Sequence, residues 1–267
     1  MKKKKVKKTV KRKPAKKVVK KKKSIKKVKK PVKKVKKPMK KTIKKVVAKI
    51  RTKLQDEKYW IARKLDDKVR DWGTDATDWL SEYWGSQSHP HRALIIEALH
   101  EIEFDSVLEV GCNVGANLNQ IKTHFPEVKL TGIDVNADAI KFASSLIGGT
   151  FEVASINKIP FGKDSFSCIL SDAVLMYIEP KKIKKAIKEI CRVTKDTVIL
   201  VEWFDNSELG KIKDYHWARN YPKLLEKEGF EIIVKHKITE QEWPNPQWVE
   251  HGYLFVAKRV NAVSKRT

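Results

Sequence analysis

A tight glycine turn between an apolar segment and a helix-like segment constrains the fold of this chain most. Ser106–Val110 is apolar and leads into a turn that contains Gly111 and Gly115, and Ala116–His124 then has helical spacing. Glycine permits a left-handed turn and lets a ligand approach the main chain. The turn therefore predicts a parallel sheet with a ligand site at the carboxyl ends of its strands, although such a turn also serves as a plain connection.

Strand-like and helix-like segments alternate after this turn. The other expected strands are Lys129–Ile133, Thr150–Ala154, Phe166–Ser171, Thr197–Trp203, Phe230–Ile238 and Tyr253–Ala257, and the other expected helices are Ala137–Leu146, Pro180–Val193 and Trp217–Lys227. This pattern predicts an α/β fold, with a mostly parallel, Rossmann-like seven-stranded sheet and helices on both faces. We expect one of the last two strands to run antiparallel, because no helix is expected between them.

A helical prefix is expected over residues 53–104, before a domain over residues 105–260. Its first helix is expected over Lys53–Trp72 and ends at Gly73. A second helix follows Thr74 or Asp75, and a third begins at Ser88. We expect this prefix to lie over the ligand site as a lid.

The prefix also carries basic and imidazole side chains. Arg92, His89 or His91 is a candidate partner for a carboxylate of the cofactor or the substrate. The two histidines also suggest a metal site, but no third ligand lies nearby in the sequence, so we expect none.

The second strand ends in an acidic residue, Asp134, about 20 residues after the glycine turn. A carboxylate at this position accepts hydrogen bonds from both hydroxyl groups of a ribose. The alternative is that Asp134 only caps the helix that follows. The glycine turn upstream favours the binding role.

From Tyr83 to Ala257 the chain resembles the class I S-adenosylmethionine-dependent methyltransferases, particularly those that act on small molecules. The segments that carry the resemblance are Glu109–Gly115, Asp134, Ser155–Phe161 with Asp164–Phe166, and Leu170–Ile178. The resemblance implies S-adenosylmethionine as the cofactor. The cofactor residues implied are Glu109, Gly111, Cys112, Asn113, Gly115, Asn117, Asp134, Val135, Asn136, Ser155, Ile156 and Ser171.

Two positions depart from the family's pattern. Asn113 stands where glycine is usual, and asparagine is the residue that best tolerates positive φ after glycine. Ser155 stands where the family often has aspartate, so its hydroxyl would accept the adenine amino group less strongly. A nicotinamide cofactor is disfavoured, because the turn lacks the full G-x-G-x-x-G spacing.

Methyl transfer mainly requires that the reacting groups are aligned and that water is excluded. Candidate catalytic residues are Asp172, Tyr177, Glu202 and His216, all expected near the carboxyl edge of the sheet. The alternative for each is an ordinary structural role, as a cap, a surface residue or a cover of the core. Trp203 and Trp217 are candidates to line an aromatic acceptor pocket.

The N-terminal tail differs sharply in composition from the rest. Residues 1–53 hold 30 Lys and Arg and no acid, which leaves 29 basic against 32 acidic residues in 54–267. We expect residues 1–52 to be a disordered polycation that associates nonspecifically with DNA or RNA. Anionic lipid as a partner and a mere solubility extension are the alternatives.

Taken together, the sequence predicts a methyltransferase that acts on a small-molecule acceptor. The alternatives are a methyltransferase for RNA or protein, and an inactive nucleic-acid-binding protein with the same fold. The signature of nucleic-acid amino-methylases is absent, since Ser171–Val174 stands in its place. We expect a cytoplasmic protein without a transmembrane segment, with nucleoid, ribosome or nuclear association through its tail. Three scattered cysteines predict neither a disulfide framework nor a zinc site.

Overall fold

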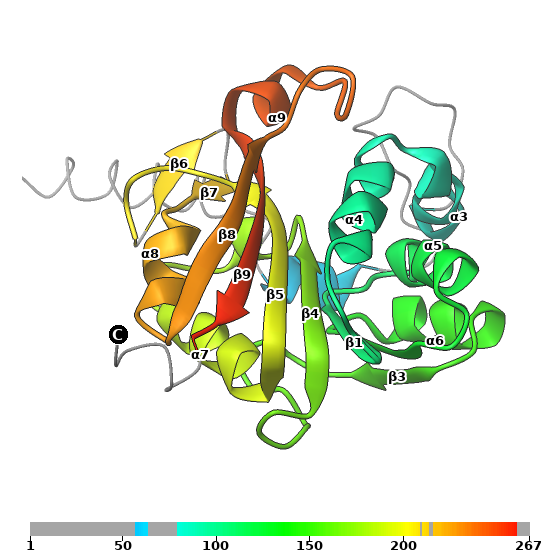
Figure 1. Cartoon of the computed structure of the whole chain (residues 1–267). Helices are drawn as coiled ribbons and strands as arrows, with labels where there is room; N and C mark the ends of the chain where they lie inside the picture. The colour runs from blue at the N-terminus through cyan, green and yellow to red at the C-terminus, as the bar shows by residue number, and fades with distance from the viewer. Residues whose placement is uncertain (1–56, 64–78, 209, 214–215, 261–267) are drawn as a thin grey trace, which may run out of the picture. The chain divides into compact units, whose positions relative to one another are not determined.

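The computed structural model describes residues 57–63, 79–208, 210–213 and 216–260, all within the unit Lys45–Thr267 (Figure 1). The strands of its main sheet are β1 (Ser106–Val110), β2 (Lys129–Asp134), β3 (Thr150–Val153), β4 (Phe166–Asp172), β5 (Thr194–Trp203), β8 (Phe230–Lys237) and β9 (Gly252–Arg259). The tail, residues 1–52, lies outside the described residues.

The seven strands are arranged in the order β3-β2-β1-β4-β5-β9-β8. Within this sheet β9 runs antiparallel to both of its neighbours, and the other strands are parallel to one another. The predictions of a mostly parallel, seven-stranded sheet and of one antiparallel strand among the last two of the chain are confirmed. The strand order reverses direction between β1 and β4, which is where α/β sheets of this kind bind their ligands.

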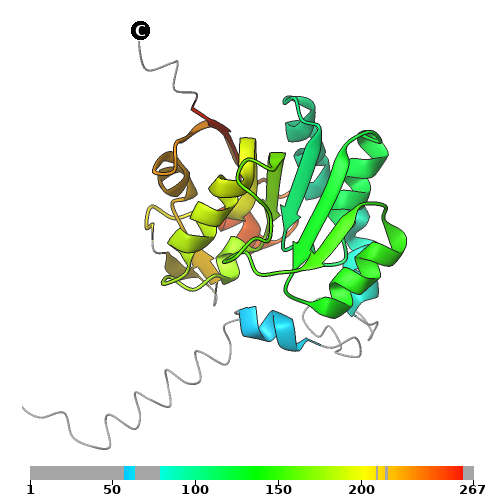
Figure 2. The ribbon, with the colours of Figure 1, turned by 90° about the horizontal axis from the view of Figure 1, so that it is seen from below.

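The helices surround the sheet on both faces (Figures 1 and 2). They are α2 (Glu57–Ala62), α3 (Trp79–Gly85), η1 (Ser86–Ser88), α4 (His91–His100), α5 (Ala116–His124), α6 (Ala137–Leu146), η2 (Leu175–Tyr177), α7 (Ile183–Val193), α8 (Tyr221–Glu226) and α9 (Pro246–His251). None of the helices in the described ranges combines the length and the apolar character that a membrane span requires.

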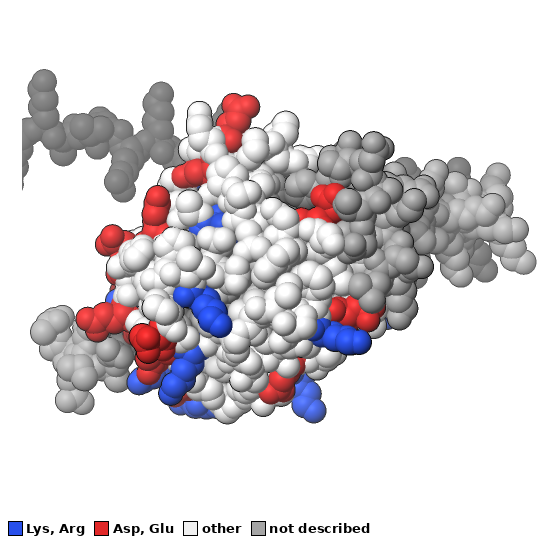
Figure 3. Space-filling model, turned by 90° about the vertical axis from the view of Figure 1, so that its right-hand side faces the viewer, with Lys and Arg blue, Asp and Glu red and all other residues white. Residues whose placement is uncertain are grey.

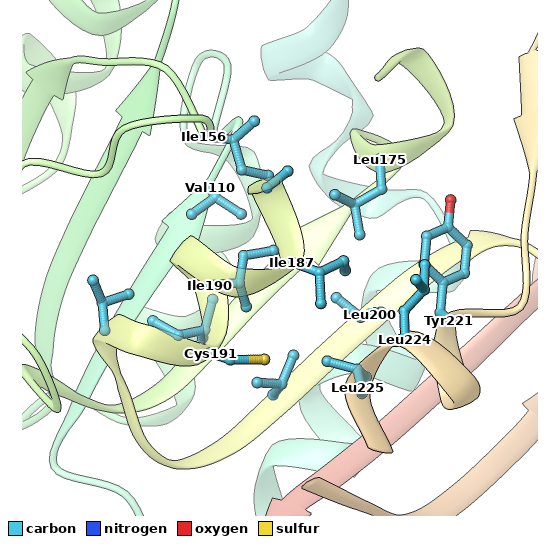
Figure 4. Packing of buried hydrophobic residues seen from close by; sticks show 14 of the residues in the cluster. Val110, Ile156, Leu175, Ile187, Ile190, Cys191, Leu200, Tyr221, Leu224 and Leu225 are labelled. Atoms are coloured by element: carbon cyan, nitrogen blue, oxygen red, sulfur yellow. The ribbon is translucent and has the colours of Figure 1, made fainter. Parts of the chain in front are cut away.

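Strand residues alternate between two apolar clusters because successive side chains point to opposite faces of a sheet. In β5, Val198 and Leu200 pack with α7 and α8, whereas Ile199 and Val201 pack with α4 and α5. Figure 4 shows the first cluster, with Ile187 of α7 close to Leu200. The sheet is therefore covered on both faces and exposes its carboxyl edge as the place for a site.

The structure corrects two expectations in the C-terminal third. The expected helix Trp217–Lys227 begins only at Tyr221, because residues His216–Ala218 form strand β7 of a small hairpin with β6 (Lys211–Lys213). Asn220 then caps α8 by accepting a hydrogen bond from the backbone N–H of Lys223. The connection between the last two strands, expected without a helix, contains α9, which the Asn245 side chain caps.

The helical prefix is described only in part. Residues 57–62 of the expected first helix are helical, and its expected end at Gly73, like Thr74 and Asp75, lies outside the described residues. The second and third helices are present as α3 and α4, with Pro90 at the N-cap of α4.

Candidate active site

A cavity of about 680 Å³ lies at the carboxyl edge of the sheet. Residues at the ends of β1, β2, β4 and β5 contribute to its wall, and α2, α3 and the segment before β9 complete it. This volume is within the range of small-molecule sites. The position agrees with the point where the strand order reverses.

The glycine turn after β1 forms one side of the cavity. Gly111, Asn113 and Gly115 all have positive φ, of 75°, 50° and 79°. The expectation that Asn113 adopts the conformation usual for glycine is therefore confirmed. A Cβ atom at Gly111 would collide with the side chain of Val174, which follows β4, so the turn and the β4 loop can lie this close only with glycine here.

Asp134 lies opposite this turn, at the end of β2. Its Oδ2 accepts a hydrogen bond from the backbone N–H of Asn113 at 2.9 Å, and its Oδ1 accepts one from Asn136 at 2.8 Å. Burial raises the pKa of the carboxyl group, while these backbone donors oppose the shift. Asp134 therefore closes the turn and also lines the cavity.

Glu109, Asn117 and Asp172 form a buried polar cluster at the ends of β1 and β4. The Asn117 amide donates to Oε1 of Glu109 at 2.7 Å and to Oδ2 of Asp172 at 2.9 Å. Oε2 of Glu109 and Oδ1 of Asp172 are buried and have no hydrogen-bond partner among the described residues. Burial raises the pKa of Glu109 to about 8. The cluster therefore presents two unsatisfied acidic oxygens beside the cavity.

Two residues of α4 complete this cluster. His91 donates from Nε2 to Oδ2 of Asp172 at 2.9 Å, and Arg92 donates to the side chains of Asn117 and Ser86. Burial raises the pKa of Asp172, but His91 and Arg92 outweigh this effect and lower the pKa to about 2. Asp172 is therefore ionised at neutral pH, and Arg92 ties the prefix to α5.

The adenine segment has a partner that the sequence did not indicate. Ser155 donates to the carboxylate of Glu57 on α2, and Lys182 forms an ion pair with the same carboxylate at 3.2 Å. Glu57 lines the cavity, and so does Trp60 one turn later. An acidic group therefore does lie beside Ser155, but it comes from the prefix.

Other predicted cofactor residues divide into two groups. Cys112, Val135 and Ile156 line the cavity. Gly115, Asn136, Ser155 and Ser171 are not among its lining residues. Asn136 caps α6 through its side-chain oxygen. Its side-chain amide also donates to the backbone carbonyl oxygens of Trp60 and Arg63, and these two hydrogen bonds attach α2 to the start of α6.

The predicted catalytic residue Glu202 supports the loop after β4 and is not among the lining residues. Its carboxylate accepts hydrogen bonds from three consecutive backbone N–H groups, those of Val174, Leu175 and Met176. The Ser171 hydroxyl donates to it as well. Burial raises the pKa of Glu202 to about 7, against the effect of these donors. Its contacts are those of a residue that positions η2.

Another part of the cavity wall is largely aromatic. Its lining residues are Tyr177, Trp203, His216, Trp243, Asn245, Gln247 and Trp248, which we call the aromatic end. His216 lies in β7 and not before a helix as expected, with its ring 5.0 Å from those of Tyr177 and Trp203. Trp217 is not among the lining residues. The sequence analysis missed Trp243 and Trp248, because nothing nearby in the sequence marked their segment as part of the site.

Within the described ranges, no group of three or more His, Cys, Asp or Glu side chains is arranged to hold a metal ion. The three cysteines are free and buried.

Comparisons with known proteins agree with this geometry. Residues 107–197 match the family described as methyltransferase domain. A chain of the complex between the Haloferax volcanii Trm112 methyltransferase activator and a methyltransferase superposes with a TM-score of 0.53 at 17% identity, covering 68% of this chain and 95% of that one. Magnesium protoporphyrin IX methyltransferase from Synechocystis PCC 6803, with bound SAM, gives 0.50 at 15% identity, covering 72% and 88%. The described residues therefore have the fold of class I, S-adenosylmethionine-dependent methyltransferases, and residues 107–197 match a methyltransferase domain.

A curated relative of this chain is an uncharacterized protein of Haemophilus influenzae. The two are 27% identical over 148 residues, which are 53% of this chain and 53% of the relative. The match thus spans about half of the relative's length. The cavity is lined by three acidic residues, Glu109, Asp134 and Asp172, which we call the acidic end, and by the residues of the aromatic end.

Proposed function

We propose that this methyltransferase transfers a methyl group to an uncharged small molecule. The observation that carries the proposal is that one cavity is lined both by the acidic end and by the aromatic end. In this proposal the acidic end binds the cofactor, and the aromatic end binds the acceptor.

The acidic end fits the groups of S-adenosylmethionine. Asp134 would accept hydrogen bonds from the ribose hydroxyl groups besides those from the backbone N–H groups of Asn113 and Asn136, since a carboxylate oxygen can accept more than one hydrogen bond. The unpartnered oxygens of Glu109 and Asp172 would bind the amino group of the methionine portion. Ile156 and Ala154 would contact the adenine, with Glu57 near its edge.

Little catalytic chemistry is required of the side chains. The cofactor supplies a methyl group that is already activated by its bond to a positively charged sulfur. The chain's own residues hold the acceptor in line, and the aromatic side chains of the cavity exclude water from it.

The acceptor end favours a molecule without charge. No residue of the aromatic end carries a formal charge with its histidine neutral, whereas nucleic-acid acceptors bring phosphate groups that require basic side chains. On the face shown in Figure 3, the described acidic and basic residues are interspersed around a wide uncharged area and form no continuous basic surface. The Synechocystis neighbour named above acts on a porphyrin, as its name states, which is also a small molecule.

For the tail we propose a separate role as a tether. Its 29 basic residues would attach the enzyme to DNA or RNA by releasing counterions, without recognising sequence. The proposed association concerns location and not the acceptor.

The test is methyl transfer to fractionated host extract. The full-length protein is first titrated with S-adenosylmethionine by calorimetry, and absence of binding would favour the inactive nucleic-acid-binding alternative. It is then incubated with extract and radiolabelled cofactor, and the products are separated into small molecules, RNA and protein. We expect label in the small-molecule fraction. Label confined to RNA or protein would contradict the proposed acceptor class.

A further inference from the structure

Two histidines and an aspartate form a chain of hydrogen bonds along the cavity wall. Nε2 of His91 lies 2.9 Å from Oδ2 of Asp172, and Nδ1 of His91 lies 2.5 Å from Nδ1 of His89. All three residues line the cavity. His89 is thereby connected to the end of β4, although it precedes α4 and is 83 positions away in the sequence.

The donors and acceptors of this chain follow from the charge of Asp172. An ionised carboxylate only accepts, so Nε2 of His91 must carry the proton. In a neutral His91, Nδ1 is then an acceptor, and the hydrogen bond from His89 must be donated by its Nδ1–H. His89 is left with an unprotonated Nε2. Among the described residues this atom has no hydrogen-bond partner, so its lone pair is available to a ligand.

The surroundings of His89 keep it neutral. Burial lowers the pKa of its imidazole to about 4, and the positive charge of Arg92 acts in the same direction, while Asp172 opposes the shift. At neutral pH the ring is therefore a proton acceptor and not a cation.

The same two histidines pack against the aromatic end. The His91 ring is stacked on Trp243 with 4.0 Å between centroids, and Trp243 is stacked on Trp248 at 3.7 Å. The His89 ring meets Trp243 edge-on at 5.0 Å. The free nitrogen of His89 thus lies where the acidic end meets the aromatic end.

We propose that His89 takes the proton from the hydroxyl group of an uncharged aromatic acceptor, and that His91 and Asp172 are the positioning residues that fix its tautomer. This proposal rests on the proposed function, because it concerns the acceptor in the same cavity. It assigns the acceptor to the class of phenols and hydroxylated heteroaromatic compounds.

The transfer balances with these residues alone. The acceptor oxygen forms a bond to the methyl carbon as the carbon–sulfur bond breaks, and the electron pair of that bond stays on sulfur. The proton of the hydroxyl group passes to Nε2 of His89. The positive charge that leaves the sulfur then resides on the pair of histidines, beside the carboxylate of Asp172. Even a weak base suffices, because the hydroxyl proton becomes strongly acidic once its oxygen begins to bind the methyl group.

The first test reads the tautomers directly. Side-chain ¹⁵N spectra of the full-length protein at pH 7 should show His89 neutral and protonated at Nδ1, and His91 protonated at Nε2. In Asp172→Asn the amide can donate to His91, so both tautomers should reverse. A charged His89, or a proton on its Nε2 in the unaltered protein, would overturn the proposal. A merely structural role for Asp172 would leave the tautomers of His89 unchanged.

The second test compares His89→Gln with His100→Gln, a matched change at the exposed far end of α4. We expect His89→Gln to lower labelling of the small-molecule fraction by roughly 100-fold or more, and His100→Gln to leave it unchanged. Both variants should bind S-adenosylmethionine as the unaltered protein does, by calorimetry. Unchanged labelling in His89→Gln overturns the role of His89. If the unaltered protein itself does not bind S-adenosylmethionine, the proposed function is contradicted instead.

The acceptor class is tested with 2-naphthol as the probe. In the presence of S-adenosylhomocysteine we expect it to quench tryptophan fluorescence and to shift the ¹⁵N resonances of His89. No binding at millimolar concentration, or binding without a shift at His89, would overturn the assignment to aromatic hydroxyl compounds.

Discussion

Asp134 at the end of β2 accepts a hydrogen bond from the backbone N–H of Asn113 at 2.9 Å, so one carboxylate joins the two motifs that were predicted separately. Oδ1 of the same carboxylate accepts a hydrogen bond from the backbone N–H of Asn136, the N-cap residue of α6. The acid proposed to bind the ribose therefore also fixes the shape of the glycine turn.

Replacing Asp134 should weaken cofactor binding and also destabilise the glycine turn. We expect Asp134→Ala to weaken binding of S-adenosylmethionine by at least roughly 100-fold, because hydrogen bonds to a charged group contribute about 1.5–3 kcal/mol each. The variant should also melt at a lower temperature, since two backbone donors lose their acceptor. Calorimetry and thermal unfolding measure the two effects. Asp138→Ala, in the first turn of α6, is the control. Unchanged affinity for S-adenosylmethionine in Asp134→Ala would exclude Asp134 from the site.

Binding of the cofactor should release a proton from Glu109. Burial raises the pKa of this group to about 8, so in the free protein it is protonated at pH 7. A positively charged amino group bound beside it would lower that pKa and release the proton. Calorimetry in buffers with different ionisation enthalpies should therefore show proton release near pH 7, which is lost in Glu109→Gln. Equal release by both proteins would contradict this role of Glu109.

The Glu109 carboxyl group also makes the stability of the free protein depend on pH. Because its folded-state pKa is raised from 4.5 to about 8, the folded protein holds a proton that the unfolded chain has already lost. The contribution of Glu109 to stability is therefore fully present below pH 4.5 and decreases as the pH rises through about 8. Unfolding by denaturant between pH 5 and 8.5 should show a steeper loss of stability in the unaltered protein than in Glu109→Gln.

Much of the fold could be predicted because parallel strands buried on both faces are continuous apolar segments between helices of regular spacing. Helices α5 and α6 have the bounds that their spacing and flanking residues indicated. Hairpin β6–β7 could not be predicted, since its strands are three residues long and the pattern of His216–Ala218 also suits a helix start. Helix α9 is only six residues long, too short for a periodic pattern.

For the site, the sequence indicated residues that follow strands and missed those brought in by distant segments. Asp172 was predicted because it follows an expected strand, and Glu109 because the resemblance to the methyltransferases implies it. The sequence could not separate Asp172, which lines the cavity, from Glu202, which supports η2, because both follow strands that end at the same edge. Trp243 enters the cavity through the connection to β9, a contact that local pattern does not encode.

Deleting residues 1–52 should separate location from catalysis. We expect the truncated protein to bind S-adenosylmethionine as before, since the acidic end is built from residues beyond this segment. Its affinity for nucleic acid should fall to near zero, and the full-length protein should lose affinity steeply as salt increases. Fluorescence anisotropy with single-stranded RNA at several salt concentrations measures this. Undiminished binding after the deletion would place a nucleic-acid surface on the folded part.

Glu57 of α2 should act as a substitute for the acid that the family often has at position 155. Its carboxylate accepts a hydrogen bond from Ser155, pairs with Lys182 and lines the cavity. We expect Glu57→Ala to weaken cofactor binding by roughly tenfold, the effect of losing about one hydrogen bond to a charged group. Lys58→Ala, at the next position of α2, should leave the affinity unchanged.

A double-mutant cycle then tests the substitution itself. Ser155→Asp alone should weaken binding, because two carboxylates would lie side by side at this position. In the Glu57→Ala background the same change should restore most of the affinity, since a single acid again faces the cavity. The double variant should therefore bind S-adenosylmethionine more tightly than the sum of the two single effects would give, and calorimetry measures this difference. Simple additivity would mean that Glu57 only attaches α2 to the domain and does not stand in for the missing acid.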